Sequence, residues 1–159
     1  MALTLTTSMC SSFKKELLFG AHDFAAAGDT FKIGLFKNEA GATGTFGAAS
    51  TSYSDVTSAT AENTGSGYTP TGGINLTSVD PVLDGTTAIC DFNDAEWTSS
   101  TITSFGAFIY NSTPNTGSIS LTNPMVAILA FGSDKASSSG TFQVVFPNAD
   151  ASNAIIRIA

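Results

Sequence analysis

Hydrophobic and polar residues alternate with a period of two in several segments of the chain, which is the pattern of half-buried β-strands. The clearest case runs from Thr141 to Phe146, where Phe142, Val144 and Phe146 share one face. A register shift of one residue would expose both phenylalanines, so we expect this face to be buried. Strands are predicted at residues 31–35, 74–79, 86–92, 102–110, 125–131, 141–146 and 154–158.

Turn signals separate nearly all of these segments. Asp80-Pro81, Asp84-Gly85, Asn123-Pro124 and Ser139-Gly140 are pairs that fix a backbone angle, tolerate a positive φ or bond to the backbone. Short strands divided in this way are typical of sandwiches and barrels. The fold class is therefore predicted to be all-β, as a single antiparallel β-sandwich or jelly-roll-like domain.

One segment near the N-terminus has helical periodicity instead. Phe13, Leu17, Ala21 and Phe24 recur at helical spacing, and Ser11 or Ser12 is available as a cap. This pattern predicts one short N-terminal helix. A glycine inside it, Gly20, costs about 1 kcal/mol relative to Ala, so we expect the helix to be stabilised by docking on a sheet.

The remaining organisation follows from length and composition. A chain of 159 residues is long enough for one domain with a core. We predict an N-terminal arm at residues 1–12 and a single β-sandwich domain at residues 13–159. Residues 39–73 are rich in Gly, Ala, Ser and Thr and show no sustained alternation, so they are predicted to form a long loop region.

Charge excludes some classes of partner. The net charge is −7, and neither Lys nor Arg occurs between Lys37 and Lys135. Nucleic-acid binding needs clustered cations, so no nucleic-acid partner is expected. No apolar run reaches the roughly 18 residues that span a bilayer, so no membrane is expected either. The N-terminus lacks a basic region followed by an apolar run, so no signal peptide is expected and synthesis in a cytoplasm is predicted.

The chain offers few groups for catalysis. Its single histidine, His22, is interpreted as a residue on the surface of the predicted helix near its C-terminal end, and the alternatives are a general base or a pH switch. Cys10 and Cys90 are too few and too far apart for a metal site, and are expected to be free thiols. We predict no catalytic residues, no cofactor and no metal, and a protein that is not an enzyme.

Two further groups of side chains, one acidic and one aromatic, have more than one possible role. Asp84, Asp91, Asp94 and Glu96 could bind a cation loosely or act as a glycosidase pair, but their spacing fits neither well and favours a solvated turn. A weak cation site near Asp91 and Asp94 is kept as an alternative.

Exposed aromatic residues could bind sugars by stacking. Tyr53, Tyr68, Trp97 and Tyr110 are the residues to consider for this chemistry. Trp97 and Tyr110 flank strand-like sequence and are more consistent with a core or sheet-edge position.

Four stretches resemble small structural proteins of tailed bacteriophages. They are Ser12-Phe-Lys-Lys-Glu-Leu-Leu18, Trp97-Thr-Ser-Ser-Thr-Ile-Thr103 leading to Gly106-Ala-Phe-Ile-Tyr-Asn111, Ala130-Phe-Gly-Ser-Asp-Lys135, and the ending Asp150-Ala-Ser-Asn-Ala-Ile-Ile-Arg-Ile-Ala159. Their order and nearly whole-chain coverage make the resemblance more specific than any one of them.

This resemblance implies a virion component, of the capsid decoration (cement) protein type. Such a protein binds the outer surface of the major capsid protein shell and stabilises the head, commonly as a homo-oligomer, typically a trimer. The N-terminal arm and helix are the candidate docking element. The alternative is a phage tail or fibre component with receptor- or carbohydrate-binding loops that contain Tyr53 or Tyr68.

Overall fold

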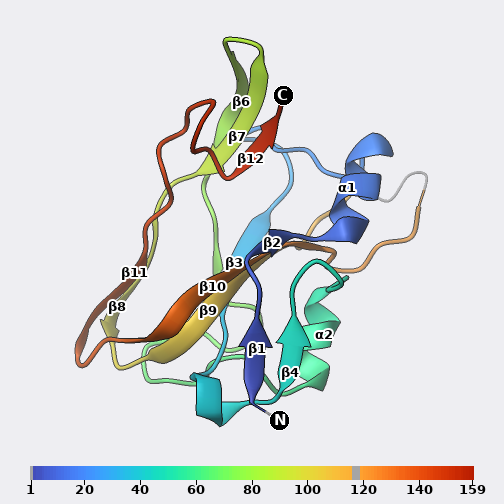
Figure 1. Cartoon of the computed structure of the whole chain (residues 1–159). Helices are drawn as coiled ribbons and strands as arrows, with labels where there is room; N and C mark the ends of the chain where they lie inside the picture. Colours follow the sequence, from blue (N-terminus) through green and yellow to red (C-terminus); the bar gives the residue numbers. More distant parts are fainter. Residues whose placement is uncertain (1, 116–118) are drawn as a thin grey trace.

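The structure, a computed structural model, describes residues 2–115 and 119–159. Strands hold 45% of the residues and helices 11%, which confirms the predicted all-β class. A five-stranded antiparallel sheet of order β2-β10-β9-β3-β5 crosses the middle of the molecule (Figure 1). Its strands are β2 (Ser8–Met9), β10 (Met125–Ala136), β9 (Thr103–Asn111), β3 (Phe31–Leu35) and β5 (Ile74–Asn75).

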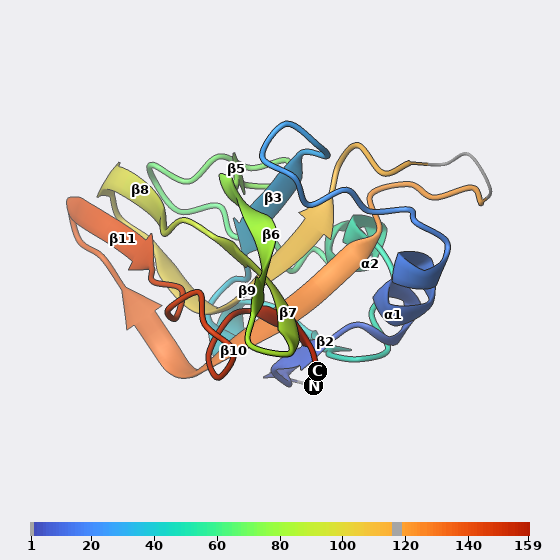
Figure 2. The ribbon, with the colours of Figure 1, turned by 90° about the horizontal axis from the view of Figure 1, so that it is seen from above.

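Three smaller sheets surround this central one. β11 (Gly140–Val144) pairs with β8 (Ala95–Ser100), and β12 (Ile156–Ile158), β7 (Thr87–Phe92) and β6 (Ser78–Asp84) form an antiparallel sheet of three. β1 (Leu3–Leu5) and β4 (Gly44–Phe46) pair in parallel. Figure 2 shows β8 and β11 on one side of the central sheet and the two helices toward the other. The β6–β7 hairpin projects at the top of Figure 1.

One face of the central sheet packs against the three-stranded sheet. Phe31 of β3 is fully buried, and its ring stacks on Phe24 at 4.3 Å between centroids. The same ring lies 5.6 Å from Phe92 of β7. Aromatic contacts of this kind add to the stabilisation that apolar burial provides. They fix β7 over the central strands.

The opposite face of the sheet is covered by α2 (Tyr53–Ser58) and β4. Phe108 of β9 is fully buried between Phe36 and Tyr53, with centroid distances of 5.2 and 5.8 Å. Its ring also lies across Gly34 of β3, the residue directly opposite it in the ladder. A Cβ at Gly34 would stand 2.2 Å from Phe108 Cζ. Glycine at this position therefore makes room for the ring.

The N-terminal helix is shorter than predicted. α1 covers Ser11–Leu18 and not residues 13–24, because Gly20 lies just beyond its end with φ +65°. Glycine commonly ends helices in this left-handed conformation. The predicted serine cap is also wrong, since the N-cap residue is Cys10 and it makes no side-chain cap bond.

Two predicted irregular regions contain regular structure. The arm at residues 1–12 contributes β1 and β2 to sheets, and Leu3 is 1% exposed. The predicted loop region at residues 39–73 contains a 3-10 turn (Glu39–Gly41), β4 and α2. α2 begins with a capping box in which Ser52 and Asp55 satisfy each other's backbone N–H groups. Neither segment is a free appendage.

Most predicted strands are present with shifted ends. The burial of Phe142, Val144 and Phe146 is confirmed, although β11 itself ends at Val144. The predicted strand 74–79 is divided between β5 and β6, and β10 continues five residues beyond the predicted end at Phe131. The sequence pattern does not predict β8. No helix among the described residues is long and apolar enough to cross a membrane.

The contact between Gly34 and Phe108 predicts the effect of one added methyl group. Gly34→Ala is expected to lower the free energy of unfolding by about 2 kcal/mol, because the buried ring has no room to move. Gly140→Ala is the matched control, since the nearest atom to its added Cβ is 3.7 Å away. Urea denaturation measures both. Equal stability of the two variants would contradict this packing.

Candidate interaction surface

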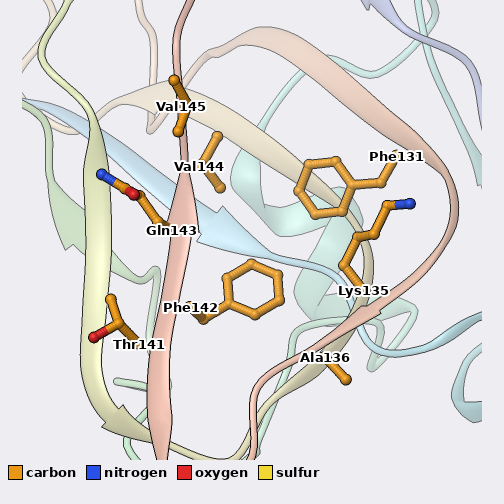
Figure 3. A pocket seen from close by; sticks show the side chains of 8 residues that line it. All are labelled: Phe131, Lys135, Ala136, Thr141, Phe142, Gln143, Val144 and Val145. Carbon is orange, nitrogen blue, oxygen red and sulfur yellow. The ribbon is translucent and has the colours of Figure 1, made fainter.

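A groove runs between β11 and the C-terminal half of β10. It has a volume of about 560 Å³. Phe131 and Phe142 point toward each other in the space between the two strands (Figure 3), with their ring centroids 6.3 Å apart. The full lining is Phe131, Lys135, Ala136, Thr141, Phe142, Gln143, Val144 and Val145. This hollow combines an aromatic floor with a polar rim.

Both strands beside the groove have an open edge. Within the described part of the chain, β11 pairs only with β8, and β2 covers β10 only at Ala127 and Ile128. Thr7 Oγ1 accepts the N–H of Ala130 at 2.9 Å, and no described strand follows it along β10 on that side. Open strand edges present unpaired backbone groups that can bind an extended segment of a partner.

Two exposed side chains border the groove. Val145 is 67% exposed, although it borders the aromatic hollow. Lys135 is exposed and donates to Ser133 Oγ at 2.9 Å, and it is the first cation after Lys37 in the sequence. An apolar segment with a carboxylate would suit both. Sequence reasoning missed this groove, although Val145 gave a signal because it is the apolar member of an otherwise polar strand face.

His22 lies in a buried polar cluster and not on a helix surface as predicted. The His22 side chain is 0% exposed, and the residue lies in the loop after α1. His22 Nε2 lies 3.0 Å from Glu16 Oε2, and Asn111 Nδ2 lies 3.0 Å from His22 Nδ1. Asn111 is oriented by two more bonds, since its Nδ2 donates to Asp29 and its Oδ1 accepts the N–H of Thr113.

This arrangement suits a neutral histidine. The Asn111 amide donates to Nδ1, which must therefore carry no proton, and Nε2–H then donates to Glu16. Burial lowers the pKa of His22 below its ordinary value, while the hydrogen bond to Glu16 and the charge of Asp29 partly oppose the shift. Both ring nitrogens have partners in the neutral form. The cluster fastens the α1 end and the following loop to β9.

A second polar cluster surrounds Glu62 on the other face of the central sheet. Tyr53 and Tyr68 donate to the two Glu62 oxygens at 2.5 and 2.9 Å, and Gly72 N–H donates at 2.7 Å. The Tyr68 hydroxyl also accepts the N–H of Leu35 at 3.1 Å. Burial and the Glu62 charge raise the pKa of both tyrosines. Sequence reasoning did not identify Glu62.

The predicted aromatic candidates are mostly enclosed. Tyr68, Trp97 and Tyr110 are 6%, 3% and 3% exposed, which confirms the core interpretation for Trp97 and Tyr110. Tyr53 is half-buried, and its ring stacks on Tyr110 at 4.9 Å. The three enclosed rings therefore present no open face of the kind on which a sugar stacks, and one face of the Tyr53 ring is covered by Tyr110.

The predicted carboxylates do not share one role. Asp91 is buried, and burial raises its pKa, with Asp150 and Asp94 adding to the rise. Asp94 accepts the N–H of Phe146 at 2.9 Å, and Asp84 accepts the N–H of Ala151 at 2.7 Å. Glu96 is exposed. The interpretation of all four as one solvated turn is therefore wrong for Asp91.

Metal-ligating residues do not gather elsewhere. Across residues 2–115 and 119–159, no group of three or more His, Cys, Asp or Glu side chains could hold a metal ion. Cys10 and Cys90 are free thiols, as predicted, and both are buried. Burial raises the pKa of each thiol to about 12, so both stay protonated at neutral pH.

The His22 cluster predicts how stability depends on pH. The unfolded chain binds a proton at His22 near pH 6.5, whereas the folded chain binds it only at lower pH. Stability is therefore expected to fall as the pH drops from about 7 through 6.5, where ordinary carboxylates do not titrate. Urea denaturation at a series of pH values should show this loss in the wild type and a flatter profile in His22→Gln. Equal slopes would contradict a neutral buried His22.

Comparisons with protein-family models, curated proteins and solved structures find no match to this chain. The functional assignment consequently depends on the chain's own residues. Among them, the groove between β10 and β11 brings together an aromatic floor, open strand edges and an exposed valine.

Proposed function

We propose that this chain is a non-enzymatic structural protein of a tailed-phage virion, of the capsid decoration type. In this role it binds the outer surface of the major capsid protein shell and stabilises the head. The groove between β10 and β11 receives an extended apolar segment of the shell protein that carries a carboxylate near Lys135. The Lys135 side chain then gains an ionic partner.

One observation carries the proposal of an assembled component. Large apolar side chains are left in water in a domain whose core is otherwise well enclosed. Leu18 is 90% exposed, Leu83 is 71% exposed and Val145 is 67% exposed. Scattered exposed apolar residues are ordinary, but here they lie on projecting elements and at a groove. Exposed apolar side chains at such places are expected in a protein that functions in a complex, because a partner buries them.

Three further points support the virion class. The four stretches that resemble phage structural proteins include one of the strands that form the groove, because Ala130 to Lys135 lies within β10. The net charge of −7 disfavours contact with packaged DNA. The buried polar side chains of the Glu16 and Glu62 clusters are used in hydrogen bonds that hold the fold together. A rigid domain of this kind suits binding by surface complementarity.

A tail or fibre component is the second candidate, without the sugar-binding role of Tyr53 and Tyr68. The Tyr68 hydroxyl is engaged by Leu35 and Glu62, and the Tyr53 ring is stacked on Tyr110. Receptor binding would therefore need other residues.

The copy number on purified particles tests the proposed function. A decoration protein is expected in hundreds of copies spread over the head, because it binds a repeated shell subunit. Quantitative mass spectrometry and electron cryo-microscopy of the particles measure both number and place. A few copies at one vertex or on the tail would overturn the decoration role in favour of the second candidate.

The groove makes a separate prediction for shell binding. Val145→Asp is expected to weaken binding to undecorated heads by about tenfold or more, because it buries a carboxylate in the apolar contact. Thr122→Asp is the control, since Thr122 is exposed and lies before the opposite end of β10. Co-sedimentation with heads measures both variants. Unchanged binding by Val145→Asp would remove the groove from the contact.

A further inference from the structure

A hollow of about 390 Å³ lies between the end of β7 and the chain that leaves β11. Val79 of β6 stands directly opposite Asp91 of β7 in the ladder, so the two side chains lie on one face of the three-stranded sheet, and both line the hollow. Asp94, in the turn between β7 and β8, also lines it, as do Phe146 and Pro147. The space bordered by these residues is called the acidic hollow below.

Asp91 is buried with one of its two carboxylate oxygens unused. The residue is 2% exposed, and its Oδ1 accepts the N–H of Phe92 at 2.8 Å. Asp91 Oδ2 is buried and has no hydrogen-bond partner among the described residues. Of the unpartnered buried side-chain atoms found in that part of the chain, only this one belongs to an ionisable group. A carboxylate oxygen in this state is costly, so it needs a partner that the chain itself does not supply.

Negative charge gathers around this oxygen. Burial raises the pKa of Asp91, and the charges of Asp150 and Asp94 raise it further, so both carboxylates lie near it. The N–H of Ile155 opposes part of this rise but forms no hydrogen bond to Oδ2. The described residues that line the hollow include no lysine or arginine, and Arg157 on the same three-stranded sheet donates to backbone carbonyl oxygens instead. A positive ion is therefore the partner that suits the unused oxygen.

We infer that the acidic hollow binds a calcium ion, with Asp91 Oδ2 and a carboxylate oxygen of Asp94 as its charged ligands. Asn93 is exposed and lines the hollow, so it offers an amide oxygen, and water completes the coordination. Because the described residues gather no group of three ionisable ligands, the remaining ligands are neutral oxygens. Asp150 contributes its charge from outside the coordination shell, since its own oxygens accept N–H groups of the loop that contains it.

The donor atoms favour calcium over other metal ions. Zinc and copper prefer histidine and cysteine ligands, and neither residue type is among the described residues that line the hollow. Magnesium demands near-ideal octahedral geometry and gives up its waters reluctantly, whereas calcium accepts six to eight oxygens in a flexible arrangement. A site with two carboxylates has a low ligand charge, so a dissociation constant of about 0.1 to 1 mM is expected.

A calcium ion at this place joins segments that are distant in the sequence. Asp94 Oδ1 accepts the N–H of Phe146 at 2.9 Å, so the turn after β7 already holds the chain that leaves β11. That chain continues through residues 147–155 to β12, which pairs with β7. An ion bound by Asp91 and Asp94 strengthens this attachment of the C-terminal segment. The inference concerns the isolated chain and does not depend on the proposed binding to a shell protein.

Titration of the chelator-treated protein with CaCl2 tests the inference. Isothermal titration calorimetry should show one ion per chain, and Tm should rise by about 3 to 6 °C at a calcium concentration of about ten times Kd. Asp91→Asn is expected to weaken binding at least about tenfold, because a neutral amide replaces a charged ligand. Asp94→Asn should act in the same direction while it keeps an oxygen for the Phe146 N–H, so it decides the matter if Asp91→Asn does not fold. Glu96→Gln is the matched control, since it removes an exposed carboxylate outside the hollow.

Other outcomes overturn the inference. Absence of binding heat at millimolar CaCl2 would exclude the site. Equal shifts of Tm with CaCl2, MgCl2 and NaCl at matched ionic strength would show only screening of an acidic surface. Binding that survives both Asp91→Asn and Asp94→Asn, or that Glu96→Gln weakens as much, would place the ion elsewhere. Head binding by Val145→Asp is measured separately, so the calcium site and the shell contact can each fail alone.

Discussion

The fold depends on the burial of β3 and β9 on both faces of the central sheet. Strands enclosed in this way must satisfy their polar groups within the protein, because unpaired buried groups are costly. Hydrogen bonds between the paired strands satisfy most of these backbone groups. The buried Asn111 side chain of β9 is satisfied by its bonds to His22, Asp29 and Thr113. The space is equally constrained, since the Phe108 ring occupies the volume that a side chain at Gly34 would need.

The same constraint explains why the two polar clusters lie where they do. The Glu16 and His22 cluster joins α1 to one face, and the Glu62 cluster joins the region around α2 to the other through Tyr53 and Tyr68. Each cluster fastens a segment that has little regular structure of its own. The titratable side chains of these two clusters are thereby engaged in holding loops against the sheet. The surfaces left for binding are apolar ones at the edges and projections.

Those surfaces arise where the strands leave the central sheet. β8 directly precedes β9 in the chain, and β11 directly follows β10. The β8–β11 pair therefore extends from the β9–β10 pair at one corner of the central sheet (Figure 2). The groove with Phe131 and Phe142 opens between them. The β6–β7 hairpin and α1 leave the sheet elsewhere and carry the exposed Leu83 and Leu18. The groove is the part of this surface on which the proposed function depends.

The sequence by itself determined the all-β class, the strands with a strict period of two and the burial of Phe142, Val144 and Phe146, because alternation and turn residues are local properties. It also identified Cys10 and Cys90 as free thiols. Only the tertiary structure decided the end of α1, the strands within residues 1–12, and the elements within residues 39–73, since these are stabilised by distant partners. His22 shows the reason most directly. Its environment comes from Glu16 and Asn111, and the second of these lies 89 positions away, so no local pattern around the histidine could reveal that it is buried.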